Sequence, residues 1–278
     1  GYNLETGITV HVGAQIQEAG SCVMPARLFF DIVRKLPDEM VSITVDHKQQ
    51  VSIRAGAAFF QITAMDSEDY PELPDVNGKS GVTMPQSALK AMISGTIFSV
   101  SENQARPIQT GCLMEVTEDS VTMVAVDSFR LARRTWHTQN AANHTLKFVV
   151  PAAGLKEIER ILEDSDEPVT FTLGDKHILF SIGDALLVSR VLEGEFIDWR
   201  RVVPTNCGTV LTANVAELTS SIERVSLIIS EKVKSPVRCV FGDNMADFRT
   251  ANTIGSAHDT CSIAGNGGEL EIGFNSRY

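Results

Sequence analysis

The sequence repeats itself at a long and nearly constant interval. Pro25 and Pro151 each precede a short amphipathic pattern at helical spacing. The interval between them is close to the one that separates Val82–Pro85 from Leu211–Asn214, and each of these segments also precedes a helical pattern. A long internal period indicates one kind of domain that is used several times along the chain. No catalytic motif recurs with the repeat, so the pattern favours a scaffold whose function depends on its overall shape.

Each repeat has two halves, and each half consists of one helix followed by strands. The order predicts the second half of a unit at residues 1–81, a complete unit at 82–207, and a first half with the start of a second at 208–278. Stretches typical of linkers at 74–81 and 204–208 separate the units. Single helices between runs of antiparallel-type strands predict an α+β fold.

Four helices are predicted from apolar residues that recur at spacings of three and four. The helix after Pro85 is expected to run to about Ser99, and residues 1–23 are expected to form strands. The four apolar faces consist of Leu28, Phe29, Ile32, Val33 and Leu36; of Leu89, Met92, Ile93, Ile97 and Val100; of Leu155, Ile158, Ile161 and Leu162; and of Val215, Leu218, Ile222, Val225 and Ile229.

Composition narrows the class of protein. No apolar run approaches the roughly 18 residues that cross a bilayer. The first residues lack the basic start and apolar block of a secretory signal, so none is expected. The five cysteines are widely scattered, which favours reduced thiols in a cytoplasmic protein. The six histidines are equally dispersed, and we expect neither a metal site nor a cofactor.

The motifs of known enzyme classes have only weak counterparts in the sequence. Residues 265–268 are rich in glycine but lack the Lys-Ser/Thr of a phosphate loop, so a hairpin turn is favoured. His258 and Asp259 near Ser256 are adjacent in sequence, which is weak support for a triad because triads are assembled in space. The carboxylates of 163–167 read as a solvated run at a helix end. An enzyme that uses the repeated fold is therefore a minor alternative.

Basic residues recur on the predicted helices. The net charge of −11 argues against nucleic acid as a partner, but the distribution of charge matters more than its total. A solvated helix face is the simplest explanation for these residues. Their recurrence on equivalent helices instead favours a weak positive track that attracts phosphates without reading bases. The residues are Arg27, Arg34, Lys35, Lys90, Lys156, Arg160 and Arg224.

Two further segments combine apolar residues with arginines. Residues 126–131 read Val-Asp-Ser-Phe-Arg-Leu, and residues 196–202 read Phe-Ile-Asp-Trp-Arg-Arg-Val. An exposed apolar group beside arginines is suited to docking a peptide. A strand turn and a latch at a domain end explain the same residues equally well, so the pattern alone leaves both interpretations open.

The sequence resembles a known family over its whole length and in order. The matching segments are PARLFFDIVRKLP at 25–37, VDSFRLA at 126–132, FIDWRRVVP at 196–204 and ELEIGFNSRY at 269–278. They are similar to the sliding clamp (β subunit) of bacterial DNA polymerase III. The resemblance implies a head-to-tail homodimer with three similar domains per subunit, helices lining an inner surface and antiparallel sheets outside.

The resemblance also implies partners and a function. Such clamps encircle duplex DNA without sequence preference, have no catalysis of their own and act as processivity factors in DNA replication. They tether the catalytic subunit of DNA polymerase III, are opened by the clamp loader, and bind other partners through clamp-motif peptides. A protein-interaction scaffold that does not encircle DNA is the alternative.

Site residues follow by position. The peptide-binding groove of the family would include Gln109, Val126, Ser128, Phe129, Arg130, Leu131, Ile197, Arg201 and Val202. A DNA-facing loop matches Asn103, Gln104 and Arg106 only loosely. Phe129 stands where the enterobacterial member has His, and Ile197 where it has Pro, so the preferred peptide is expected to differ. Family members extend further at both ends, and this stretch alone is expected neither to close a ring nor to bind peptide at full strength.

Overall fold

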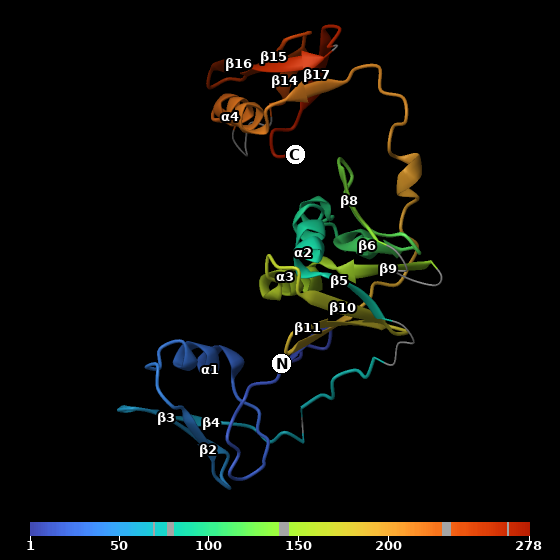
Figure 1. The fold of residues 1–278 in the computed structure, drawn as a ribbon. Coiled ribbons are helices and arrows are strands. Elements are labelled where there is room, and N and C mark those ends of the chain that lie inside the picture. The colour runs from blue at the N-terminus through green and yellow to red at the C-terminus, as the bar shows by residue number, and fades with distance from the viewer. Residues whose placement is uncertain (69, 77–80, 139–144, 230–234, 266) are drawn as a thin grey trace. The chain divides into compact units, whose positions relative to one another are not determined.

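The computed structural model describes all residues except 69, 77–80, 139–144, 230–234 and 266 (Figure 1). It forms two compact units, residues 1–197 and 198–278. The predicted linker at 74–81 lies partly outside the described residues, as does Asn266 of the predicted hairpin turn at 265–268.

The first part of unit one is a small sheet with one helix. Strands β2 (Ser42–Val45), β3 (Gln50–Ala55) and β4 (Ala58–Thr63) are antiparallel neighbours in that order. The Asp46 side chain closes the predicted turn between β2 and β3, because its Oδ1 accepts from the backbone N–H of Lys48 and of Gln50 at 2.8 Å each. The sequence predicts this hairpin, because two β-branched runs flank the polar residues 46–50, and the structure confirms it.

Helix α1 (Ala26–Val33) packs against this sheet through only part of its predicted apolar face. Ile32 is buried, and Phe29 and Leu36 pack against the same cluster. Leu28 and Val33 are nearly half exposed, so their assignment to the buried face was wrong. Residue spacing alone could not distinguish these exposed residues from the buried ones, because the width of an apolar stripe on a helix does not show how much of the stripe the sheet covers.

The N-terminal strand joins the sheet of the following repeat. β1 (Thr6–Val10) pairs with β12 (Ala185–Arg190), and the register runs from Thr6 opposite Ser189 to Val10 opposite Ala185. The complete sheet has the order β1-β12-β11-β10-β5, where β11 is His177–Ile182, β10 is Pro168–Leu173 and β5 is Gly81–Pro85. Of the strands expected within residues 1–23, β1 is the one that forms, with isolated bridges at Tyr2 and Val23.

A second antiparallel sheet completes the core of unit one. Its order is β8-β7-β6-β9, with β8 at Leu131–His137, β7 at Ser120–Val126, β6 at Gly111–Val116 and β9 at Leu146–Pro151. Helices α2 (Gln86–Ser94) and α3 (Ala152–Ile161) contact each other and bury Leu89, Ile93, Leu155 and Ile158 in one cluster with both sheets (Figure 1).

Helix α2 is shorter than predicted. It ends at Ser94, and a separate 3-10 helix, η1 (Ile97–Ser99), follows Gly95 and Thr96. The buried Thr96 hydroxyl donates to the backbone carbonyl of Met92 at 2.8 Å, which closes the last turn of α2. Ile97 and Val100 still pack against the core, so their apolar character was read correctly although the helix does not reach them.

Unit two is a five-stranded antiparallel sheet with one helix on it. The strand order is β13-β16-β15-β14-β17, formed by Leu211–Ala213, Ser256–Gly265, Met245–Ala251, Val237–Phe241 and Leu270–Phe274. α4 (Val215–Ser226) packs on it through Leu218, Ile222 and Val225. Asn214 caps α4, because its Oδ1 accepts from the backbone N–H of Glu217 at 3.2 Å. Val215 is 78% exposed and does not belong to the buried stripe.

The repeat is visible in how the helices begin. Pro25 and Pro151 are the N-cap residues of α1 and α3, and β5 leads into α2 as β13 leads into α4. Single helices alternate with antiparallel strands throughout the described residues, so the α+β class is confirmed.

Candidate peptide and DNA interfaces

The hairpin between β7 and β8 is held by Asp127. Val126 ends β7 and pairs with Leu131, the first residue of β8. Asp127 Oδ1 accepts from the backbone N–H of Phe129 at 2.7 Å and of Arg130 at 2.9 Å. An aspartate that hydrogen-bonds the backbone ahead of it stabilises a tight turn. The carboxylate therefore sets the shape of the loop that displays Ser128 and Phe129.

The Arg130 side chain lies against the protein instead of extending into solvent. Its Nε donates to Asp127 Oδ2 at 3.1 Å, and its Nη2 donates to the backbone carbonyl of Phe98 in η1. The guanidinium carbon also lies 5.5 Å from the centroid of the Phe98 ring. Partial burial acts to raise the pKa of Asp127, but the donors of Phe129 and Arg130 outweigh it and the pKa is lowered overall.

Exposure divides the predicted groove residues. Phe129 is 76% exposed and Ser128 is exposed, whereas Leu131 is half-buried. Val126 and Gln109 are buried, so their side chains offer little surface to a ligand. The hairpin thus brings together Val126, Ser128, Phe129, Arg130 and Leu131, while Gln109 lies in the 3-10 helix η2 (Pro107–Thr110).

The remaining groove residues follow the hairpin at a distance along the chain. Ile197 is half-buried at the end of unit one. Arg201 and Val202 belong to unit two, where the 3-10 helix η3 (Trp199–Arg201) lies. Both are exposed, and Arg201 Nε lies 3.0 Å from Asp198 Oδ2.

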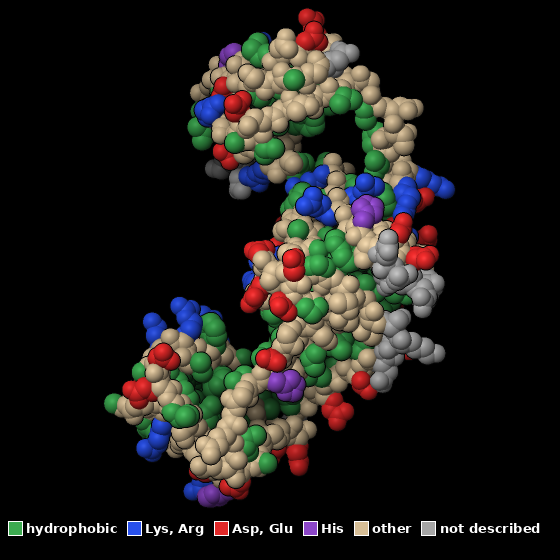
Figure 2. Space-filling view, in the orientation of Figure 1, with side chains coloured by type: hydrophobic (Ala, Val, Ile, Leu, Met, Phe, Trp, Pro, Cys, Tyr) green, Lys and Arg blue, Asp and Glu red, His purple; other side chains and the backbone are tan. Residues whose placement is uncertain are grey.

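The basic residues predicted to face DNA differ in their surroundings. Among the described residues, Arg27, Lys35 and Lys156 are exposed and take part in no ion pair, and Figure 2 shows Lys and Arg side chains gathered over the part of the chain that carries α1. Arg34 is exposed and lies 5.7 Å from the Phe30 ring. Lys90 pairs with Asp164 at 3.1 Å, Arg160 with Glu157 at 2.7 Å, and Arg224 with Asp259. Of the loop residues, Asn103, Gln104 and Arg106 are all exposed.

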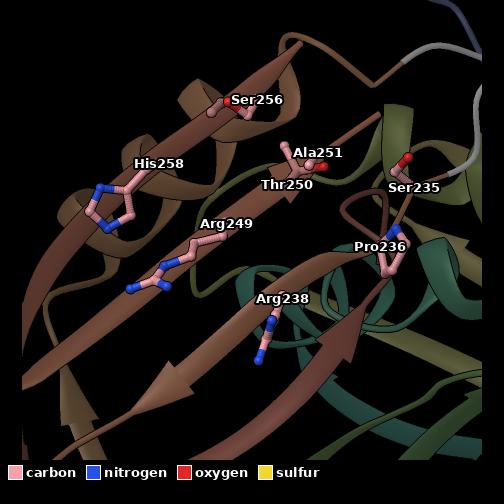
Figure 3. A pocket seen from close by; sticks show the side chains of 9 residues that line it. Ser235, Pro236, Arg238, Arg249, Thr250, Ala251, Ser256 and His258 are labelled. Atoms are coloured by element: carbon pink, nitrogen blue, oxygen red, sulfur yellow. The ribbon is translucent and has the colours of Figure 1, made fainter. Parts of the chain in front are cut away.

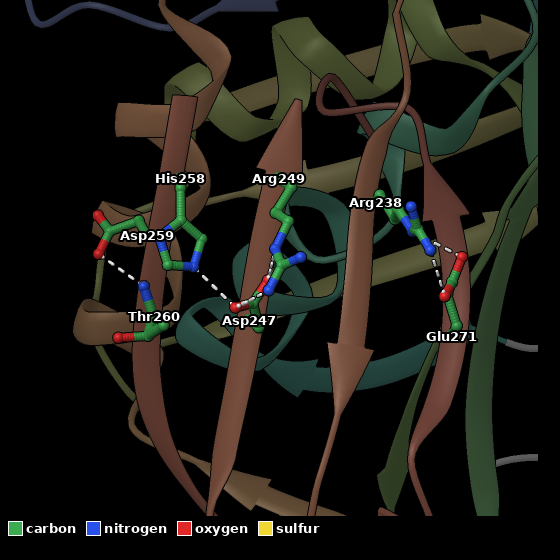
Figure 4. A network of polar contacts seen from close by, with 7 residues as sticks. All are labelled: Arg238, Asp247, Arg249, His258, Asp259, Thr260 and Glu271. Atoms are coloured by element: carbon green, nitrogen blue, oxygen red, sulfur yellow. Dashed lines mark hydrogen bonds and ion pairs between the residues drawn. The ribbon is translucent and has the colours of Figure 1, made fainter. Parts of the chain in front are cut away.

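A polar network crosses the sheet of unit two (Figure 4). Arg238, Arg249 and His258 are opposite one another on β14, β15 and β16. Asp247 lies 2.6 Å from Arg249 Nε and 2.7 Å from His258 Nε2, and Glu271 lies 2.6 Å from Arg238 Nε. The hydrogen bond from Arg249 lowers the pKa of Asp247, and the one from Arg238 lowers the pKa of Glu271.

This network rules out the triad suggested by adjacency. His258 is bound to Asp247, whereas Asp259 pairs with Arg224 of α4. Neighbouring residues of a strand point to opposite faces of the sheet, which separates the two side chains.

An open hollow of about 630 Å³ lies beside the network (Figure 3). Its basic side chains, Arg238 and Arg249, are each matched by a carboxylate of the network. Because both guanidinium groups are paired with carboxylates, the hollow offers little attraction to a phosphate. Its lining is Ser235, Pro236, Arg238, Arg249, Thr250, Ala251, Ser256, Ala257 and His258.

Two kinds of feature are absent from the described residues. No three His, Cys, Asp or Glu side chains in this part of the chain are grouped to hold a metal ion. No described helix has the length and apolarity required to cross a membrane.

Two residues that contact the Arg130 side chain, Asp127 and Phe98, are not among the site residues expected from the sequence. Asp127 could have been recognised, since an Asp followed by Ser at the end of a strand is a turn signal. Phe98 could not, because its contact with Arg130 joins residues that are distant along the chain.

Comparison with known proteins agrees with this architecture. Residues 1–74, 83–198 and 200–278 match the N-terminal, central and C-terminal domains of the DNA polymerase III beta subunit. The beta sliding clamp of Staphylococcus epidermidis is 30% identical over 266 residues, which cover 95% of this chain and 70% of that protein. The Staphylococcus aureus clamp is 31% identical over 265 residues, with the same coverage.

Solved structures agree as well. A putative DNA polymerase III beta subunit from Eubacterium rectale superposes with a TM-score of 0.93 at 31% identity, over 99% of this chain and 75% of that one. A Bartonella birtlesii sliding clamp bound to griselimycin gives a TM-score of 0.92 at 28% identity, over 100% of this chain and 76% of that one. The fold is therefore that of a DNA clamp built from repeated domains. The chain belongs to the beta sliding clamp family, and it is a DNA sliding clamp of the replication machinery.

Proposed function

We propose that this clamp is a non-catalytic, cytoplasmic, head-to-tail homodimeric ring that encircles duplex DNA. In this proposal residues 1–81, 82–207 and 208–278 contribute to three successive clamp domains, and their helices line the inner surface. The clamp loader opens the ring, and the catalytic subunit of DNA polymerase III is tethered to it. The observation that carries the proposal is the recurrence of basic residues at equivalent helix positions, with Arg34 and Arg160 at the same place after Pro25 and Pro151.

Diffuse attraction is what a sliding ring requires. Arg27, Lys35 and Lys156 are exposed cations without an ion-pair partner among the described residues. Arg27 and Lys156 extend from helices, whereas Lys35, which was expected on the helix, lies in the turn that follows α1. Contacts to phosphates hold a protein near DNA but carry no sequence information, so they permit movement along the duplex. We assign the same role to two further groups of residues. Lys90, Arg160 and Arg224 each have a carboxylate partner, which weakens the positive potential around them. The other group consists of Asn103, Gln104 and Arg106 in the exposed loop.

We assign peptide binding to the β7–β8 hairpin. Phe129 supplies a large exposed apolar surface, and Leu131 lies half-buried beside Val126 at the base. Partner peptides anchored by apolar side chains suit such a surface. Gln109, Ile197, Arg201 and Val202 remain proposed contacts on the basis of family position.

Linearisation of the DNA tests encirclement. Full-length protein loaded by its clamp loader on a nicked circle is expected to stay bound through gel filtration, because a closed ring cannot leave a closed circle. Cutting the circle at one restriction site should release it within minutes. The matched control is the same circle cut and blocked at both ends with a bulky protein. Equal loss from the circular and the linear DNA would contradict encirclement.

Unpaired strand edges support the homodimer. Among the described residues, β4 pairs with β3 alone, and the first half of β16 pairs with β15 while β13 covers only Ile263–Gly265. Free edges are templates for pairing with another chain. We propose that β4 of one copy adds to β16 of the next, and two such head-to-tail contacts close a ring.

A charge on β4 tests this pairing. Phe59 is 49% exposed on β4, and a lysine at an edge strand opposes pairing. Phe59→Lys is expected to weaken dimerisation of the full-length protein by about tenfold or more in sedimentation equilibrium. Met40→Lys, at an 88% exposed position outside the strands, is the control and should dimerise normally. A Phe59→Lys dimer as tight as the wild type would exclude β4 as the contact.

A further inference from the structure

The proposed peptide site continues beyond the hairpin onto η1. Phe98 is 54% exposed although it is a large aromatic residue in an ordered 3-10 helix. Exposed aromatic rings held on a rigid element are typical anchors of peptide and protein interfaces. Family position did not point to Phe98, and it becomes visible only through its contacts with Arg130.

Arg130 connects the two elements. On one side its Nε donates to Asp127 Oδ2 at 3.1 Å, and on the other its Nη2 donates to the carbonyl of Phe98. The planar guanidinium also lies close to the Phe98 ring, at 5.5 Å from its centroid. Arg130 is thus the tie between the hairpin that carries Phe129 and the helix that carries Phe98.

Asp127 determines the position of the Arg130 side chain. Both of its oxygens are engaged, Oδ1 by two backbone N–H groups and Oδ2 by the guanidinium. The Asp127 side chain is only 15% exposed, so water competes weakly for these bonds. Removing the carboxylate would free both the turn and the arginine.

We infer that Phe98 is an additional wall of the peptide groove and that Asp127 is the residue that positions the groove through Arg130. The inference rests on the proposed peptide-binding role of the hairpin. Phe98 contacts Arg130, and Phe129 precedes Arg130 in the hairpin. These two exposed rings suit a partner peptide with bulky aliphatic or aromatic side chains. A surface that is already organised before binding loses less conformational entropy when the peptide arrives.

The test uses a fluorescein-labelled peptide from the C-terminal tail of the replicative polymerase, with fluorescence polarisation for affinity and stopped flow for rates. Phe98→Ala is expected to weaken binding by about tenfold, mainly through faster dissociation, because a contact is lost. Asp127→Ala is expected to weaken it by a similar factor, mainly through slower association, because fewer molecules have the organised loop. Asp127→Asn should lie between Asp127→Ala and the wild type, since an amide oxygen still accepts from the backbone but does not pair with Arg130.

Asp119 provides the matched control. It lies in the turn at the other end of β7, and its Oδ1 accepts from the Thr117 hydroxyl at 2.7 Å. Asp119→Ala removes a turn carboxylate from the same sheet, so it reproduces a general loss of stability without touching the groove. Its peptide affinity is expected to equal that of the wild type.

The outcomes separate this inference from the function on which it rests. Leu131→Ala tests the hairpin as the peptide site, and unchanged affinity in that variant would remove the proposed site itself. If Leu131→Ala weakens binding while Phe98→Ala and Asp127→Ala do not, the site stands and the inference is overturned. Equal losses in the Asp119 and Asp127 variants would show a general structural effect and would also overturn it. Griselimycin, which is bound in the Bartonella birtlesii clamp, serves as a second probe for the same variants.

Discussion

Truncation of Phe171 to alanine is expected to destabilise unit one by about 3–5 kcal/mol. Phe171 is 1% exposed on β10, and its ring centroid lies 6.3 Å from that of Phe148 on β9 and 5.8 Å from that of Phe180 on β11. The ring therefore joins the two sheets of the core. Its removal loses apolar burial and leaves a cavity that strands of both sheets cannot readily close. Urea unfolding followed by tryptophan fluorescence measures the change in the free energy of unfolding.

Phe30→Ala is the matched control for this truncation. Phe30 is 57% exposed on α1, and its recorded ring contact is with Arg34. The expected loss is below about 1 kcal/mol, the range of an exposed cation–π pair. A Phe171 variant that unfolds at the same urea concentration as the wild type, with an unchanged slope, would contradict the assignment of Phe171 to the core.

Reversal of charge at Arg34 and Arg160 is expected to lower the affinity of the clamp for DNA strongly. Each arginine that contacts a phosphate contributes about 0.9 to the slope of log K against log salt, so Arg34→Glu with Arg160→Glu should reduce that slope by roughly 2. The measurement is the equilibrium affinity of the full-length clamp for a linear duplex with open ends, which the ring can enter and leave, as salt is raised. We expect sliding to persist at low salt, because no single contact fixes the ring to one site.

A second double variant controls for net charge. Lys48 and Lys176 are exposed in strand turns, between β2 and β3 and between β10 and β11. Lys48→Glu with Lys176→Glu changes the net charge equally but leaves the helices unaltered. If both double variants lost affinity for open linear duplex to the same extent, total charge and not the position of the arginines would govern binding, and the proposed DNA-facing surface would be wrong.

Much of the fold could be predicted from local patterns. Strand-like runs around polar residues predict the turn at Asp46, and they predict that Val237–Phe241 pairs with Ala246–Ala251 across residues 242–244. Both are confirmed. Helix ends were less predictable. The apolar pattern continues through Ile97 and Val100, yet α2 ends at Ser94. The pattern does not locate the end of the helix, because an apolar residue can pack against the core from a helix or from the segment after it.

Of the contacts in the candidate site, likewise, only those between residues close in sequence could be predicted. A strand turn within residues 126–131 is one of the two interpretations that the sequence allows, and Asp127 and Arg130 are close enough along the chain to contact each other there. Phe98 and the ion pairs of Lys90 and Arg224 could not be predicted, because their partners come from distant parts of the chain. Whether an arginine or lysine on a helix faces solvent freely or is neutralised depends on such partners.

The sequence by itself determined the repeat, the α+β class and the membership of a clamp family, because hydrophobic periodicity and turn chemistry act over a few residues and recur in each unit. Only the tertiary structure decided that β1 joins β12 in the sheet of the following repeat, that Asp247 instead of Asp259 binds His258, and that Arg130 ties Phe98 to the hairpin. These contacts depend on which strands are neighbours in a sheet and on which face of the sheet each side chain lies. The packing of the whole unit sets the strand order and the orientation of the side chains.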